Sequence, residues 1–123
     1  MIKLKDLIIE GWNSNIWEND EPEEKEPIAK RLGRCYELCG KYVMYHDGWT
    51  LVHGKLTNPF ESGHPEMEHA WVEKGDEIFD PVMHKIWPKQ VYESLFKAKI
   101  KKKYSQREVF QITDKTANWG PWN

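Results

Sequence analysis

The chain has 123 residues, enough for one domain, which excludes multi-domain enzymes and β/α barrels. Eighteen basic and twenty acidic side chains give a net charge of −2, which argues against a dedicated nucleic-acid binder. No apolar run approaches the ~20 residues of a membrane span, and two Cys without a secretory signal fit a reducing compartment. We therefore expect one cytoplasmic domain over residues 1–123, with no membrane partner.

The first part of the chain gives weak signals. Residues 1–17 fit a strand or a helix equally well, whereas the acidic, proline-containing residues 18–27 predict an exposed loop. Pro27 suits the first turn of a short helix that Gly33 interrupts.

Residues 34–46 have a clear helical pattern. Apolar side chains recur at three- and four-residue spacing, at Cys35, Leu38, Cys39, Tyr42 and Val43. This spacing places them on one face of a helix. The Asp47-Gly48 pair should end that helix.

Strand signals follow. Residues 49–56 favour a strand, residues 58–65 read as an irregular loop, and residues 68–73 and 77–82 flank a Gly-containing turn at 74–76. The last two strands should therefore form a hairpin.

The C-terminal segment, about 88–118, is expected to be mainly helical. Val91, Leu95 and Phe96 lie on one face of its first helix, and the basic residues 97–103 form a strand or an extended connector. Ser105 and Glu108 form a capping box that opens a last helix toward Ala117. A helix, then strands, then helices indicates the α+β class.

Three residues have the chemistry of covalent acyl transfer. Cys35 lies at the start of a predicted helix, where the helix dipole favours the thiolate and unpaired backbone N–H groups can stabilise an oxyanion. His69 and Asp80 lie on facing strands of the predicted hairpin, where an imidazole and a carboxylate can meet. A nucleophile, a base and an orienting acid would then be assembled.

The blocks GRCYELCGKYV, HAWVE and EIFDP resemble the Cys, His and Asp blocks of transglutaminase-like enzymes in the papain-like superfamily, which includes peptide N-glycanases. The resemblance covers about residues 33–82. It implies a papain-like core with the nucleophile at a helix N-terminus packed on a small antiparallel sheet. It also implies Cys35 as nucleophile, His69 as general base and acid, and Asp80 as the group that orients His69.

The substrate would be a peptide, protein or small molecule with an amide, ester or thioester carbonyl. Trp71 shares a strand face with His69 and either walls the site or packs beneath it, while His64 and Trp17 can contact substrate. No Gln precedes Cys35 to complete an oxyanion hole. We expect no cofactor and no metal, because HExxH and CxxC spacings are missing. The oligomeric state is not indicated.

Two other functions remain open. The chain contains seven Trp, and Trp-rich surfaces often anchor partners, so a non-catalytic binding or inhibitory module on the same fold is the first alternative. The His53-Gly54 pair at a strand end also resembles ADP-ribosyltransferases, with Glu73 or Glu93 as the late glutamate. We expect the Trp side chains mainly to enlarge a small core.

Overall fold

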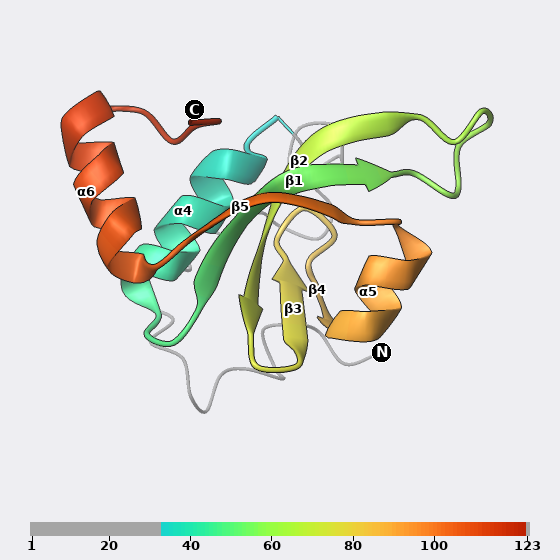
Figure 1. The fold of residues 1–123 in the computed structure, drawn as a ribbon, viewed down its shortest axis with the longest axis horizontal. Coiled ribbons are helices and arrows are strands. Elements are labelled where there is room, and N and C mark those ends of the chain that lie inside the picture. Colours follow the sequence, from blue (N-terminus) through green and yellow to red (C-terminus); the bar gives the residue numbers. More distant parts are fainter. Residues whose placement is uncertain (1–32, 123) are drawn as a thin grey trace.

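A computed structural model describes residues 33–122 of the chain. In this part the chain forms a five-stranded antiparallel sheet and three helices (Figure 1). The elements are α4 (Cys35–Tyr45), β1 (Thr50–Thr57), β2 (Glu66–Lys74), β3 (Glu77–Asp80), β4 (Lys85–Pro88), α5 (Lys89–Leu95), β5 (Lys99–Tyr104) and α6 (Gln106–Thr116). The expected α+β class is confirmed. The expectations for residues 1–32, including Trp17, fall outside the described residues.

The sheet has the strand order β4-β3-β2-β1-β5, and every neighbouring pair is antiparallel. The predicted hairpin joins β2 and β3, where Lys74 faces Glu77 across a two-residue turn. Gly75 has a φ of +56° in this turn, a conformation that glycine adopts without a Cβ penalty. The hairpin fixes which β2 and β3 residues face each other.

The two faces of the sheet carry separate apolar clusters. Helices α4 and α6 lie on one side of the sheet and α5 on the other (Figure 1). The α4 cluster comprises Cys35, Leu38, Cys39, Tyr42, Val43, Leu51, Ala70, Val72, Phe79, Val82, Tyr104 and Val109. The α5 cluster comprises Val52, Leu56, Trp71, Ile78, Tyr92 and Phe96. Alternating residues of β1 and β2 therefore serve opposite faces.

Local signals explain helices α4 and α6. All five residues on the predicted apolar face of α4 are buried. In α6 the Ser105 hydroxyl accepts from the Glu108 backbone N–H at 3.2 Å, and the Glu108 carboxylate accepts from the Ser105 N–H at 3.0 Å. The predicted capping box is thus confirmed, and it satisfies N–H groups that a helix start leaves without partners.

The first helix of the C-terminal segment differs from the expectation at two of three residues. Phe96 is buried, but Val91 and Leu95, predicted on the same face, are 48% and 37% exposed, and Tyr92 is buried in their place. The two aromatic rings, one helical turn apart, bury more apolar area than Val91 and Leu95 would. Between α5 and α6, the basic residues expected to form a strand or an extended connector form β5, which pairs with β1.

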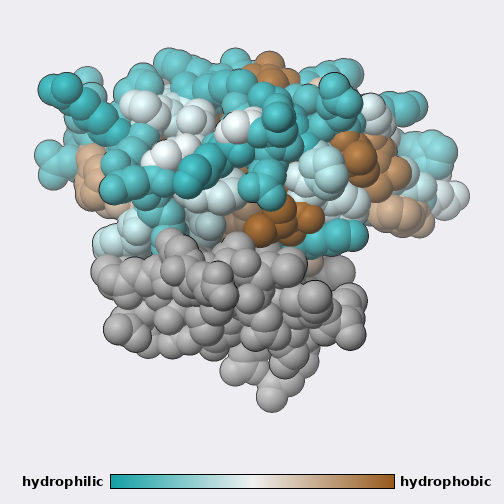
Figure 2. Space-filling model, turned by 90° about the horizontal axis from the view of Figure 1, so that it is seen from below, coloured by the Kyte–Doolittle hydropathy of each residue, from teal (hydrophilic) through white to brown (hydrophobic). Residues whose placement is uncertain are grey.

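Four of the five Trp residues of the described part lie in the core or pack against it. Trp71 is fully buried, Trp49 and Trp122 border the α4 cluster, and Trp87 borders the α5 cluster. Viewed from below, the described surface is mostly hydrophilic, with apolar residues in separate patches (Figure 2). None of the helices between residues 33 and 122 has the length and apolarity needed to cross a bilayer.

Candidate active site

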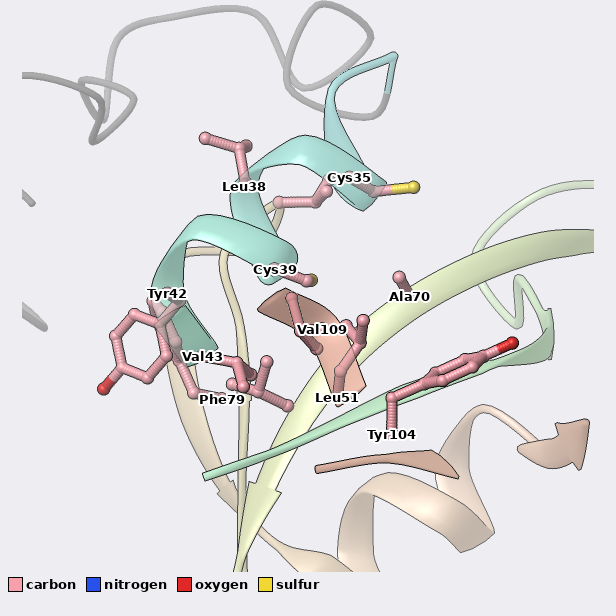
Figure 3. Packing of buried hydrophobic residues seen from close by; sticks show 12 residues of the cluster. Cys35, Leu38, Cys39, Tyr42, Val43, Leu51, Ala70, Phe79, Tyr104 and Val109 are labelled. Atoms are coloured by element: carbon pink, nitrogen blue, oxygen red, sulfur yellow. The ribbon is translucent and has the colours of Figure 1, made fainter. Parts of the chain in front are cut away.

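Cys35 is the first residue of α4. Arg34, which precedes it, makes no side-chain capping hydrogen bond, so no cap from this residue occupies the first N–H groups of the helix. The sulfur of Cys35 points away from the helix at the edge of the α4 cluster, whereas Cys39 points into the cluster (Figure 3). Cys35 is 4% exposed and Cys39 is fully buried. The two thiols of one helix thus have different surroundings.

His69 and Asp80 form a buried pair. His69 Nε2 lies 2.8 Å from Asp80 Oδ2, and neither side chain is exposed. The hydroxyl of Tyr92 donates to the same oxygen at 2.6 Å. Asp80 Oδ1 accepts the backbone N–H groups of Val82 at 2.9 Å and Met83 at 3.3 Å. The carboxylate is therefore held at both oxygens.

These contacts set the charges of the pair. Burial alone would raise the pKa of Asp80, but the charge of His69 and the hydrogen bonds from His69 and Tyr92 lower it. Burial alone would lower the pKa of His69, but Asp80 raises it above the ordinary value. An ionised carboxylate only accepts hydrogen bonds, so Nε2 of His69 carries a proton and donates.

The Cys35 thiol is a neighbour of the same imidazole. After Asp80, Cys35 is the second group that raises the pKa of His69. Nδ1 of His69 is buried and has no regular hydrogen-bond partner among the described residues. The Cys35 thiol is thus near enough to affect the His69 imidazole, although Nδ1 makes no hydrogen bond of standard geometry to a described residue. Because Asp80 occupies Nε2, Nδ1 is the nitrogen left for the thiol.

The candidate substrate residues have different positions. Trp71 has no exposed surface and stacks beside His69 with ring centroids 6.4 Å apart, so it packs beneath the imidazole and does not line an open cleft. His64 lies in the exposed loop between β1 and β2, with a φ of +45°. Trp17 lies outside the described residues. Tyr92 is not among the site residues that the sequence predicts, because the apolar spacing of this segment favours Val91, Leu95 and Phe96 for one face.

The histidine–aspartate pair should make stability depend on pH. Because the pKa of His69 is raised above 6.5, its stabilisation is complete below pH 6.5 and is lost as pH rises through the folded-state pKa. Because the pKa of Asp80 is lowered from 3.8, its stabilisation is present above pH 3.8 and is lost as pH falls through the folded-state pKa. The difference in unfolding free energy between the unmodified protein and Asp80→Asn should therefore be largest between pH 3.8 and pH 6.5 and should decrease at higher pH.

Urea unfolding of both proteins at about pH 5, 7 and 9 measures this difference. His46 and His53 also titrate, because burial lowers the pKa of each to about 4. Both are present in the two proteins, so their contributions largely cancel. A difference that stays constant from pH 5 to pH 9 would contradict the assignment of a charged pair.

Comparisons with known proteins add no relative: no family model, curated protein or solved structure matches the chain. Among residues 33–122, His, Cys, Asp and Glu side chains do not gather in any group of three that could hold a metal ion. The candidate site therefore stands on its own geometry, which unites a thiol at a helix start with a buried imidazole and carboxylate.

Proposed function

We propose that the protein is a cysteine hydrolase or acyltransferase with a transglutaminase-like, papain-like core, acting on an amide, ester or thioester. The observation that carries this proposal is the buried 2.8 Å contact between His69 and Asp80 beside the thiol of Cys35. A charged imidazole and carboxylate are costly to bury, so the pair favours a role beyond packing.

In the first step, the Cys35 thiolate, paired with the imidazolium of His69 whose Nδ1 already holds the proton, attacks the carbonyl carbon. A C–S bond forms, and the carbonyl electrons move to oxygen. The oxyanion faces the first backbone N–H groups of α4, to which Arg34 adds no cap. When the carbonyl reforms, the leaving amine, alcohol or thiol takes the proton from His69.

In the second step, water or an amine attacks the acyl group on Cys35. The neutral Nδ1 of His69 removes a proton from the attacking molecule, and the sulfur of Cys35 departs as a thiolate, which restores the resting thiolate–imidazolium pair. Asp80 keeps Nε2 protonated and Nδ1 directed at the thiol throughout, and Tyr92 and the backbone hold Asp80 in place. Water gives hydrolysis, and an amine gives acyl transfer.

Alkylation by iodoacetamide, mapped by mass spectrometry, tests the nucleophile. Cys35 should be alkylated at neutral pH, because the adjacent imidazolium of His69 stabilises the thiolate. Cys39 should remain unmodified, since burial raises its pKa well above the ordinary value. His69→Gln should slow the alkylation of Cys35 strongly.

An activated ester, p-nitrophenyl acetate, tests the acyl-enzyme directly. The intact protein should carry an acetyl group on Cys35 that hydrolyses with time, and Cys35→Ala should carry none there. Cys39→Ala is the matched control and should acylate normally. If Cys35 alkylates like an ordinary thiol and takes no acetyl group, the enzyme proposal fails and a binding module on this fold becomes the better explanation.

A further inference from the structure

A small hollow lies on the α4 side of the sheet. It is lined by residues of α4, β1, β2, β5 and the C-terminal tail, namely Tyr36, His53, Gly54, Glu68, Lys101, Lys102, Tyr104, Pro121 and Trp122. Its free space of about 20 Å³ accepts one water-sized group. It is distinct from the His69–Asp80 pair but close to it in the chain. Of its lining residues, Tyr36 directly follows Cys35, and Glu68 directly precedes His69.

His53 has an unsatisfied buried ring at this hollow. The side chain is 3% exposed, and neither Nδ1 nor Nε2 has a hydrogen-bond partner among the described residues. The rings of Tyr36, Tyr104 and Trp122 surround it at centroid distances of 4.8, 4.9 and 5.3 Å. Buried polar atoms usually find partners, so an imidazole left without any is suited to hydrogen-bond a ligand that enters the hollow.

A β-bulge directs two positive charges to the same place. On β5, Lys102 pairs with His53 and Ile100 pairs with Gly54, so Lys101 between them has no partner on β1. An extra residue of this kind allows consecutive side chains to lie on one side of a strand, and both lysines line the hollow. Bulges commonly redirect side chains next to functional sites.

The balance of charge selects the ligand. Lys101 and Lys102 are positive and Glu68 is negative, and the Glu68 carboxylate already pairs with Lys101 at 3.6 Å. Lys102 lies 5.3 Å from the centroid of the Tyr104 ring. The hollow therefore keeps one net positive charge beside an unsatisfied imidazole, which disfavours an amine and favours an anion with hydrogen-bond acceptors.

We infer that this hollow binds a carboxylate group, one oxygen of which enters beside His53 while Lys101 and Lys102 compensate its charge. The imidazole donates to the carboxylate, and the side chains of Tyr36 and Tyr104 line the same hollow. The carboxylate belongs either to a free small acid or to the C-terminus of a peptide. Its use as a substrate subsite beside Cys35 rests on the proposed function, whereas the binding itself does not.

Acetate titrated into the full chain tests the inference, with the imidazole C–H resonances followed by NMR and assigned with His53→Gln. The His53 resonances should shift saturably, with a dissociation constant on the order of 10 mM. The pKa of His53, which burial and Lys101 lower to about 4, should rise when acetate is bound. Binding should therefore tighten as pH falls toward the pKa of acetate and weaken below it, where acetate is protonated. Glu68, Lys101, Lys102, Tyr36 and Tyr104 are the other ionisable groups that line the hollow.

Two lysine variants separate the site from general attraction by charge. Lys101→Gln removes a positive charge from the lining of the hollow. Lys99→Gln is the matched control, because it removes a positive charge from the same strand at a residue that pairs with Glu66. Lys101→Gln should weaken acetate binding about two- to fivefold, and Lys99→Gln should leave it unchanged. Equal effects of the two variants, unmoved His53 resonances, or equal binding of chloride would overturn the inference.

The source of the carboxylate is resolved by a tripeptide with a free C-terminus and the same tripeptide amidated. Tighter binding of the free peptide than of acetate identifies a chain terminus, and weaker binding identifies a small acid. Equal binding of the amidated peptide would overturn the requirement for a carboxylate. Repeating the titration with Cys35→Ala keeps the test independent of catalysis, because this variant removes the proposed nucleophile and leaves the hollow intact.

Discussion

Asp80→Ala should lower the free energy of unfolding by about 3–5 kcal/mol, because it leaves buried partners without an acceptor. The imidazole of His69 would lose its hydrogen bond to the Asp80 carboxylate, which is 2.8 Å long. The Tyr92 hydroxyl would lose its bond to the same carboxylate, which is 2.6 Å long. The backbone N–H groups of Val82 and Met83 would lose theirs as well. Each unpaired buried donor adds its own desolvation cost.

Denaturant unfolding followed by Trp fluorescence measures this loss. Asp114→Ala, at an exposed position of α6, is the matched control and should leave stability nearly unchanged. Adding His69→Ala to Asp80→Ala should cost much less than His69→Ala alone, since the two side chains form one interaction. Additive losses would contradict a coupled pair.

Gly54→Ala should cost about 3 kcal/mol of stability, because a Cβ at this position meets its neighbours in the sheet. The new carbon would lie 2.8 Å from Cη2 of Trp71 and would collide with the backbone carbonyl oxygen of Lys99. The carbonyl cannot turn away without breaking the β1–β5 ladder. We therefore expect faster amide hydrogen exchange along β5 as well as lower stability.

Gly63→Ala is the control for this change. Nothing lies within 4 Å of a Cβ at Gly63, and only its φ of +84° disfavours alanine. That strain should cost about 1 kcal/mol, with no effect on exchange in β5. If Gly54→Ala and Gly63→Ala destabilise equally, the close approach of β5 to Gly54 is not what requires glycine there.

The features that could be predicted from sequence are those determined by neighbours in the chain. The buried face of α4, the hairpin between β2 and β3, and the Ser105–Glu108 capping box each depend on residues within about a dozen positions. The approach of His69 to Asp80 followed from the same hairpin, and their contact is 2.8 Å. Whether they act in catalysis stays a prediction.

The features that were missed depend on contacts between distant segments. The buried face of α5 is set by Trp71 and Ile78 on the sheet. They favour Tyr92, beside the predicted Phe96, over Val91 and Leu95. The pairing of β5 with β1 joins segments about fifty residues apart, and no local period specifies it. The bulge at Lys101 could not be predicted from the sequence, because nothing distinguishes Lys101 from the other lysines of this segment.

The lysine strand has a consequence for the border of the sheet. Within the described part of the chain, β5 is the last strand of the sheet, and its residues from Lys99 to Lys103 are all exposed. A second copy adding its own strand here would meet an irregular backbone and a row of ammonium groups. Growth of the sheet from molecule to molecule, the first step toward fibrils, is thereby opposed at this border by shape and by charge.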